Sequence, residues 1–239
     1  MSTLFIADLH LHDERPELTR AFLQFLQKKA VHADALYILG DLFEAWIGND
    51  DPSETATSVS KGLKSLSSAG IKIYLQHGNR DFLIDHQFAQ HAGVQLLAEA
   101  CRITPYNKPL LLMHGDQLCL DDIEYQKFKE LVRSPQWRQD FLAKPLVDRQ
   151  AIAADLRKQS QSSGQQKTMA IMDVSAAEVD RIMDEYGVDI LIHGHTHRPD
   201  IHLLNNGKCR IVLGDWDSKL WYLEWHPDNH YNLRNQTID

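Results

Sequence analysis

Five short polar blocks in this chain of 239 residues carry side chains that could bind a metal ion. They are Asp8-Leu9-His10, Gly40-Asp41, Gly78-Asn79-Arg80-Asp81, His114-Gly115-Asp116 and Gly194-His195-Thr196-His197. In an extended chain, residues i and i+2 project from the same face, so Asp8 and His10 could reach one ion together, as could His195 and His197. Each block alone is a weak signal, because a single histidine after a strand is more often a hydrogen-bonded structural residue. Only the five blocks taken together indicate a metal site.

The blocks together supply seven donors, all of them oxygen or nitrogen. These are Asp8, His10, Asp41, Asn79, His114, His195 and His197. The absence of sulfur favours Mn, Fe, Zn or Mg over a structural zinc finger. Seven protein ligands are too many for one ion, but a bridging carboxylate would make two sites of four ligands each. Two ions about 3.5–4 Å apart, with room for a bridging hydroxide, form the arrangement used for in-line attack on phosphorus.

Each block follows an apolar run that predicts a β-strand. Strands are expected at residues 3–7, 35–39, 71–76, 109–113 and 190–192, and two more at 209–213 and 220–225. Apolar residues at helical spacing predict a helix over residues 17–30 and another that includes Ala56, Val59, Leu63 and Leu66. This alternation indicates an α/β layered domain, and open α/β sheets place their ligand sites just after the carboxyl ends of strands.

Between residues 116 and 190 the pattern changes to helical periodicity without a strand. We expect a helical cap at residues 121–169, inserted into a core made of residues 1–120 and 170–239. Residues 122–170 hold nine Lys or Arg and six Asp or Glu, a local charge of +3, which leaves −11 for the rest of the chain. The polar stretch 160–167 breaks the helical pattern and is predicted to be a surface loop.

Composition excludes several classes of protein. The chain is 43% hydrophobic and 24% charged, as expected for one globular domain or two small ones. Its longest apolar runs are about five residues, far below the roughly 18 needed to cross a bilayer. The first residues lack the basic region of a signal peptide, so we expect a cytoplasmic protein in which Cys101, Cys119 and Cys209 are reduced thiols. A net charge of −8 without a long basic stripe makes a nuclease or other nucleic-acid binder a poor interpretation.

The order of the blocks, from residue 8 to residue 197, resembles the signature of the calcineurin-like metallophosphoesterases. Segments 5–11, 77–83, 171–174 and 193–199 are similar, more narrowly, to the bacterial UDP-2,3-diacylglucosamine diphosphatases, and this resemblance extends over nearly the whole chain. It implies a layered sandwich of β-sheets flanked by helices, with the cap inserted. It also implies hydrolysis of UDP-2,3-diacylglucosamine, through water attack on the α-phosphorus, to UMP and 2,3-diacylglucosamine 1-phosphate in lipid A biosynthesis.

The resemblance also assigns the metal ligands. It implies two Mn²⁺ ions per chain, with Asp41 as the bridging ligand. The first ion would be bound by Asp8, His10, Asp41 and His197, and the second by Asp41, Asn79, His114 and His195.

Catalytic roles are implied for Asp41, Arg80 and His195. The general superfamily motif has histidine where this chain has Arg80, and the diacylglucosamine subfamily has arginine there. A guanidinium suits a diphosphate, because it is always charged and offers a bidentate fork. Substrate contacts are implied for Asn79, Arg80, Asp122, Ser160, Gly164, Lys167 and His195. At position 164 better-known members have asparagine, and Gly164 offers only backbone groups; Arg157 and Lys167 could neutralise phosphate.

Residues beside the blocks are expected to support them. Glu44 and Asp81 are candidate partners of the ligands, and Asp116 could orient His114. His77 and His193 should point to the opposite face of their strands, in supporting or core roles. We expect packing against the core, rather than contact with acyl chains, for four residues of the cap: Trp137, Phe141, Leu142 and Leu146.

The expected partners are an acylated sugar nucleotide and the cytoplasmic face of the inner membrane, where an apolar, basic cap would allow peripheral association of a monomer. Three alternatives remain. A phosphodiesterase or dinucleoside-polyphosphate hydrolase acting on soluble nucleotides would not need an acyl groove. A non-catalytic scaffold, like the retromer subunit that resembles a phosphoesterase, would tend to lose ligands. A nuclease is the third.

Overall fold

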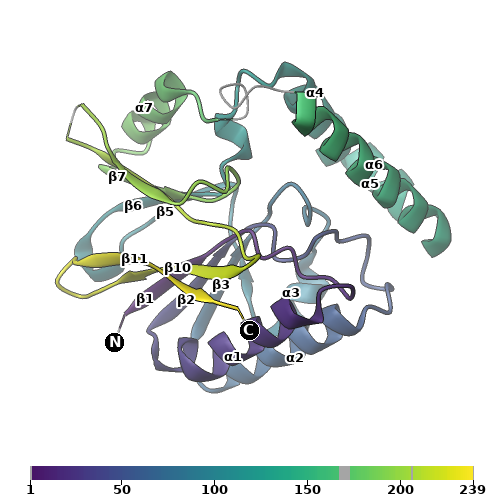
Figure 1. Cartoon of the computed structure of the whole chain (residues 1–239), viewed down its shortest axis with the longest axis horizontal. Coiled ribbons are helices and arrows are strands. Elements are labelled where there is room, and N and C mark those ends of the chain that lie inside the picture. Colours follow the sequence, from purple (N-terminus) through teal and green to yellow (C-terminus); the bar gives the residue numbers. More distant parts are fainter. Residues whose placement is uncertain (1, 167–172, 206, 239) are drawn as a thin grey trace.

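Two β-sheets pack face to face, and helices cover their outer sides (Figure 1). The computed structural model describes residues 2–166, 173–205 and 207–238, with side chains described as far as Ser160 in the helix that ends at Gln166. The strand order is β11-β10-β1-β2-β3-β4 in the six-stranded sheet and β5-β6-β7-β9-β8 in the five-stranded sheet. The predicted α/β layered sandwich is thereby confirmed.

Within each sheet, the strands that carry the polar blocks run parallel to one another. The six-stranded sheet contains β1 (Thr3–Ile6), β2 (Ala35–Leu39), β3 (Lys72–Gln76), β4 (Gln95–Leu96), β10 (Lys219–Trp225) and β11 (Tyr231–Thr237). The five-stranded sheet contains β5 (Ala100–Ile103), β6 (Leu110–Met113), β7 (Ile190–His193), β8 (Asp200–Leu203) and β9 (Cys209–Val212). Strands β1 to β4 run parallel, as do β6, β7 and β9. Their carboxyl ends therefore lie at a common edge of the sandwich.

The helices divide into two outer layers and an insertion. Helices α1 (Pro16–Lys28), α2 (Glu54–Ser68) and α3 (His86–Ala92) pack on the six-stranded sheet, and α7 (Ala176–Glu185) packs on the five-stranded sheet. The insertion contains α4 (Ile123–Arg133), α5 (Pro135–Leu142) and α6 (Leu146–Gln166). Several helices begin where a side chain accepts a hydrogen bond from a first-turn amide; these N-caps are Ser53, Asp85, Asp122, Ser134 and Ser175.

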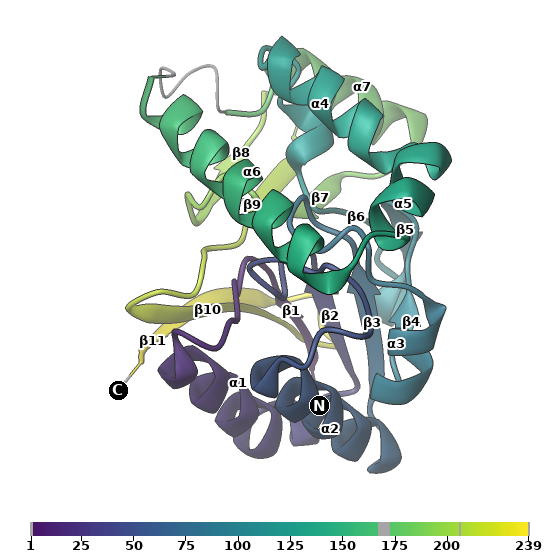
Figure 2. The ribbon, with the colours of Figure 1, turned by 90° about the vertical axis from the view of Figure 1, so that its right-hand side faces the viewer.

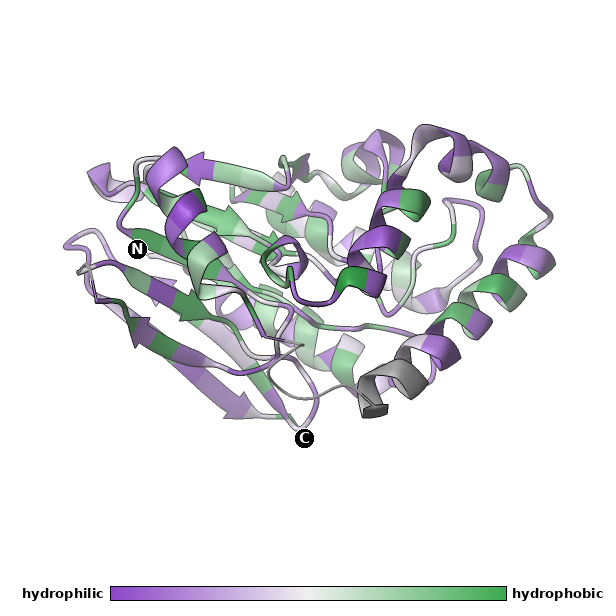
Figure 3. Cartoon of the chain, turned by 90° about the horizontal axis from the view of Figure 1, so that it is seen from above, coloured by the Kyte–Doolittle hydropathy of each residue, from purple (hydrophilic) through white to green (hydrophobic). Residues whose placement is uncertain are grey.

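Alternation along the strands builds three apolar layers. In β1, Leu4 and Ile6 face the α1–α3 layer, whereas Phe5 and the following Ala7 face the other sheet. Residues on both faces of this strand are fully buried, as is usual for parallel strands covered on both sides. Green, apolar ribbon is accordingly concentrated on the central strands, while the helices of the insertion carry both colours (Figure 3).

The seven predicted strands are the inner strands of the two sheets, and each is confirmed to within one or two residues. The structure adds the four edge strands, β4, β5, β8 and β11, which the sequence analysis missed. An edge strand has a neighbour on one side only, so it is short or polar and lacks a continuous apolar run. Strand β11, with the sequence YNLRNQT, is mostly exposed in its second half.

The insertion is helical as predicted, and no strand occurs in the described parts of 116–189. The prediction of a surface loop at 160–167 is wrong for residues 160–166, which continue α6; Lys167 lies outside the described residues. Just before this stretch, Gln159 donates to Asp155 one turn earlier at 2.7 Å, and such local hydrogen bonds stabilise a helix without an apolar period.

The cap residues expected to pack against the core do so with one exception. Phe141 is 4% exposed, and Trp137 and Leu146 pack against the apolar layer of the core. Leu142 is 42% exposed, contrary to the expectation that it packs against the core. Helix α6 runs obliquely across the sandwich in Figure 2. None of the helices in the described ranges has the length and apolar character needed to span a membrane.

The α1 layer should contribute strongly to stability. Phe22 is fully buried and packs edge-on against Trp216, with ring centroids 6.1 Å apart. We expect Phe22→Ala to lower the free energy of unfolding by about 3–5 kcal/mol, because it leaves a cavity. Phe128→Ala, at a 38% exposed position in α4, should lower it by less than about 1 kcal/mol. Urea unfolding measures both, and equal losses would contradict this assignment of the core.

Candidate metal centre

Five loops meet at the common edge of the two sheets. They follow β1, β2 and β3 in one sheet and β6 and β7 in the other, and each contains one of the polar blocks. Hydrogen bonds link several of them directly: the Asp8 amide donates to the Gly40 carbonyl at 3.1 Å, and the Gly194 amide donates to the His114 carbonyl at 2.8 Å. The seven predicted ligands, which are far apart in the sequence, are therefore brought together.

Two carboxylates reinforce these links. Asp8 Oδ2 accepts from the His195 amide at 2.8 Å, which joins the β1 and β7 loops. Asp81 is fully buried and accepts from the amides of Leu42 (2.8 Å) and Gly78 (2.7 Å), which joins the β2 and β3 loops. Asp81 thus supports the site as expected, through the backbone of the loops rather than through a ligand side chain.

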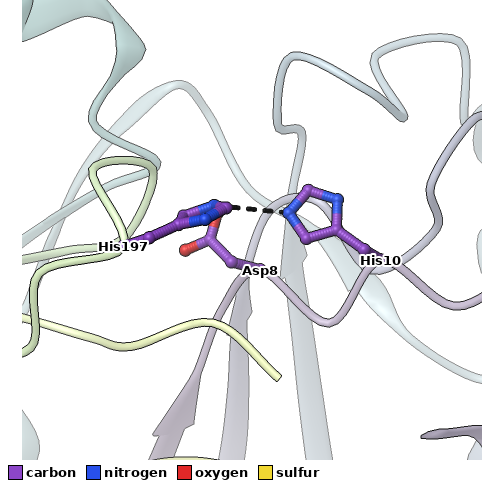
Figure 4. Close-up of side chains that lie close together, drawn as sticks. All are labelled: Asp8, His10 and His197. Carbon is purple, nitrogen blue, oxygen red and sulfur yellow. Dashed lines mark hydrogen bonds and ion pairs between the residues drawn. The ribbon is translucent and has the colours of Figure 1, made fainter. Parts of the chain in front are cut away.

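Asp8, His10 and His197 form the first cluster of donor side chains (Figure 4). His10 Nε2 and His197 Nε2 face each other at 3.3 Å, and His197 Nε2 lies 3.5 Å from Asp8 Oδ1. A separation of 3.3 Å is compatible with two nitrogen donors that share one ion at about 2.0–2.1 Å each.

Asn79, His114 and His195 form the second cluster. Asn79 Oδ1 lies 2.9 Å from both His114 Nε2 and His195 Nδ1. Asp41 lies between the clusters, with Oδ2 3.9 Å from His10 Nε2 and 3.7 Å from His114 Nε2. This is the position that a carboxylate bridging two ions needs. Asp8 also has an oxygen within reach of the Asp41 and His114 donor atoms.

The backbone at these positions is unusual. Asp8, His10, Asp41, His195 and His197 all have positive φ, between 49° and 67°. Non-glycine residues rarely adopt this left-handed conformation, and it concentrates at functional sites. The expected extended backbone is therefore wrong at these positions. Asp8 and His10 still lie in one cluster, whereas His195 and His197 do not share one. The tight turns instead direct His195 towards Asn79 and His197 towards His10.

Burial and charge make the site suitable for cations. Asp8, Asp41 and His114 are at most 2% exposed. Burial lowers the pKa of His197, but the neighbouring Asp8 carboxylate outweighs burial and raises that pKa to about 9. Burial and the neighbouring His114 lower the pKa of His195 to about 3, which leaves its ring neutral and able to bind a metal.

The donor set fits divalent metal ions. Asp8 Oδ1 is buried and accepts no hydrogen bond from any described residue, although a buried carboxylate oxygen normally does. The surrounding donors are carboxylate, amide and imidazole, which suit Mn, Fe, Zn or Mg.

Glu44 holds His10 in place and connects it to the insertion. Its Oε2 lies 3.1 Å from His10 Nδ1, and its Oε1 lies 3.0 Å from Arg157 Nε on α6. A carboxylate on one ring nitrogen fixes the tautomer and leaves the other nitrogen for a metal, so the expected supporting role of Glu44 agrees with the geometry.

Asp116 does not orient His114, contrary to our expectation. His114 Nδ1 is 2.8 Å from the Leu39 carbonyl and its Nε2 is 2.9 Å from Asn79, so both ring nitrogens are engaged elsewhere. Asp116 Oδ2 instead contacts side chains of α4. The expected supporting or core positions of His77 and His193 agree with the structure: His77 Nε2 lies 2.7 Å from the Ile84 carbonyl, and His193 is fully buried.

The expected substrate contacts are distributed between the core and the insertion. Arg80 is half-buried beside Asp41, to which its amide donates at 2.8 Å, and its guanidinium pairs with no acid of the described chain. Asp122 caps α4, and Ser160 is exposed on α6. Gly164 lies on the backbone of α6, and Lys167 lies outside the described residues.

Sequence analysis missed three polar residues near the centre. Tyr125, Lys129 and Arg133 all reach Asp116 from α4. The three residues are spaced four apart, so they share one face of the helix. A search for polar residues at helical spacing would have found them, whereas our search considered apolar residues only.

A sandwich of this topology with seven O and N donors at its loop edge defines a metallophosphoesterase. A model of the family described as calcineurin-like phosphoesterase matches residues 1–199, and the chain belongs to this family.

Its similarity to particular relatives is more specific. The chain is 53% identical over 227 residues to the UDP-2,3-diacylglucosamine hydrolase of Cellvibrio japonicus, a match that covers 94% of this chain and 95% of the relative. It is 48% identical to the protein of the same name from Marinobacter nauticus, with coverage of 100% and 99%.

Among solved structures, a novel archaeal phosphodiesterase aligns with 99% of this chain and 100% of its own, at a TM-score of 0.51 and 10% identity. That likeness supports the fold alone.

Gly78 is required by the close approach of its backbone to Asp41. A Cβ at this position would lie 2.0 Å from Asp41 Oδ1 and 2.4 Å from the Asp41 amide. We expect Gly78→Ala to displace Asp41 and to weaken Mn²⁺ binding at least about tenfold, measured by isothermal titration calorimetry.

The matched control is Gly187→Ala, which has open space around its Cβ but a φ of +61°. It should lower stability by about 1 kcal/mol and leave Mn²⁺ affinity unchanged. Unaltered Mn²⁺ binding in Gly78→Ala would show that Asp41 does not need this contact.

Proposed function

We propose that the chain hydrolyses the diphosphate bond of UDP-2,3-diacylglucosamine to UMP and 2,3-diacylglucosamine 1-phosphate, a step of lipid A biosynthesis. The observation that carries this proposal is the cluster of seven donors at the loop edge, in a chain about 50% identical over its length to proteins named UDP-2,3-diacylglucosamine hydrolase.

Two ions, Mn²⁺ in our proposal, would lower the pKa of a bound water and polarise phosphoryl oxygens. Asp8, His10, Asp41 and His197 would hold one ion, and Asp41, Asn79, His114 and His195 the other. Glu44 and the Leu39 carbonyl orient two of these imidazoles before any ion binds. The water oxygen attacks the α-phosphorus, and the bond from that phosphorus to the bridging oxygen breaks. The bridging oxygen leaves with 2,3-diacylglucosamine 1-phosphate.

Arg80 is suited to the diphosphate itself. Its amide donates to Asp41, while its guanidinium lies near Glu44 without forming an ion pair in the described chain. A preorganised, unpaired guanidinium can grip phosphate oxygens and stabilise the charge that develops on them, in our proposal together with His195. Arg157 is paired with Glu44, so a substrate phosphate would compete with that carboxylate for it.

The insertion, which we propose as a cap over residues 121–169, would bind the acylated part of the substrate. Asp122, Ser160, Gly164 and Lys167 would contact the sugar nucleotide from this side, with Gly164 acting through its backbone. Trp137 and Phe141 are stacked with ring centroids 4.8 Å apart, and Trp137 also lies 6.1 Å from Phe82 of the core. We propose that the acyl chains lie along the outer side of this aromatic junction between insertion and core.

Helix α4 supports peripheral association with the inner membrane from the cytoplasmic side. Its inward stripe is polar, whereas Ile123, Phe128 and Leu131 are 62%, 38% and 59% exposed. Apolar side chains exposed on a helix are stabilised when they contact the apolar interior of a membrane. A substrate with acyl chains also resides in a membrane. We propose that the protein acts there as a monomer.

Two alternatives are disfavoured by specific features. A non-catalytic scaffold does not need seven donors held in strained turns. A hydrolase for soluble nucleotides does not need exposed apolar residues on an insertion beside the site.

Mn²⁺-dependent release of UMP from UDP-2,3-diacylglucosamine tests the proposal directly. We expect turnover that EDTA abolishes and Mn²⁺ restores, with ¹⁸O from labelled water recovered in UMP. Asp41→Asn should reduce turnover at least about 1,000-fold, because it removes the charge that both ions share.

Asp228→Asn, at an exposed acid between β10 and β11, is the control and should retain full activity. Circular dichroism establishes that both variants fold. Label in the sugar phosphate would place the attack on the other phosphorus, and cleavage of soluble diesters alone would refute the lipid substrate.

Sedimentation with vesicles containing anionic phospholipid tests the membrane contact. The double variant Ile123→Ser/Leu131→Ser should bind at least about tenfold more weakly, because each buried aliphatic side chain contributes roughly 1.5–3 kcal/mol. Leu203→Ser removes an 82% exposed leucine on β8 and should leave binding unchanged. Equal effects of the two changes would argue against α4 as the membrane-facing surface.

A further inference from the structure

One face of α4 converges on a single buried carboxylate. Tyr125, Lys129 and Arg133 lie one turn apart and approach Asp116 Oδ2 at 2.8, 3.2 and 3.0 Å. Asp116 is fully buried and lies two residues after His114. The insertion is therefore attached directly to the loop that carries a predicted ligand.

Arg133 makes a contact that the other two residues do not make. Its Nη2 also donates to the Gly78 carbonyl at 3.1 Å, and its Nη1 pairs with Glu99. Gly78 immediately precedes Asn79, so this guanidinium spans the β3 loop and the β6 loop. Its side chain is 14% exposed, and burial protects these hydrogen bonds from competition with water.

The two loops must be held in register for their donors to meet. Asn79 Oδ1 lies 2.9 Å from both His114 Nε2 and His195 Nδ1, and a small shift of either loop would separate them. The Gly78 peptide is held on both sides: its amide donates to Asp81 at 2.7 Å, and its carbonyl accepts from Arg133. The first contact comes from the core and the second from the insertion.

We propose that Arg133 is a positioning residue for the second ion: from the insertion, it fixes the β3 and β6 loops relative to each other so that Asn79 and His114 can bind that ion together. The inference rests on the two-ion centre of the proposed function. A planar fork is needed for this role, because a lysine head group cannot span Asp116, the Gly78 carbonyl and Glu99 in one plane.

Lys129 provides a matched comparison on the same face of the same helix. It also places a positive charge on Asp116, at 3.2 Å, but no described contact joins it to Gly78. Removing Lys129 therefore changes the charge around Asp116 and leaves the span between the two loops intact.

The test is Mn²⁺ binding to the full chain. Calorimetry measures the affinity, and electron paramagnetic resonance detects the coupled signal of two neighbouring ions. We expect the unmodified protein to bind two ions. Arg133→Met should bind the second ion at least about tenfold more weakly and lose the coupled signal, as Asn79→Ala should, while the first ion binds as before. Lys129→Met should retain both ions and the coupled signal.

Arg133→Lys keeps the positive charge and should also lose the coupled signal. It replaces Arg133→Met in the test if circular dichroism shows that Arg133→Met does not fold. If the variant that folds, Arg133→Met or Arg133→Lys, retains the coupled signal, the inference is overturned. Equal weakening of both ions, or the same loss in Lys129→Met, would also overturn it, since either result indicates general destabilisation or a charge effect. If the unmodified protein binds no Mn²⁺, the proposed function itself fails, and that result is seen before any variant is compared.

Discussion

Burying the carboxylates of Asp8 and Asp41 between two β-sheets requires positive charge and hydrogen-bond donors around them. The chain supplies part of this through backbone amides, from His195 to Asp8 and from Arg80 to Asp41. The remaining oxygens face imidazoles that would repel one another if all were protonated. Divalent cations would resolve the conflict, because they would neutralise the carboxylates and bind the neutral rings. The left-handed turns, the close-packed glycines and the links between loops all serve to hold these few groups in place.

The same constraint explains why the insertion is more than a cover. Helix α4 directs Tyr125, Lys129 and Arg133 inward, towards Asp116, and exposes Ile123, Phe128 and Leu131 to solvent. Helix α6 reaches the other half of the site, where Arg157 and His10 share Glu44. In the proposed function, the element that contacts lipid is therefore mechanically connected to both halves of the metal centre. An acylated substrate that displaces Arg157 from Glu44 would act on a group that orients a metal ligand.

Sequence patterns predicted the inner strands because those strands are buried on both faces and need continuous apolar runs. The edge strands β4, β5, β8 and β11 escaped prediction because half of their surroundings is solvent, so pairing rather than composition defines them. The stretch 160–166 was mistaken for a loop for a related reason. Local hydrogen bonds such as Gln159 to Asp155 stabilise this part of α6, and they leave no apolar periodicity in the sequence.

The sequence by itself determined which seven candidate donors are present, that none is sulfur, and that each follows a strand. These properties depend on residue type and local order along the chain, and both are readable without a fold. Residue spacing alone did not decide how the donors group; the resemblance implied the grouping, and the tertiary structure produces it. The separation of His195 from His197 depends on backbone turns that spacing does not reveal. The contact of Arg133 with Gly78, 55 residues away in sequence, depends on how an insertion packs against loops from both sheets, and no local pattern encodes that packing.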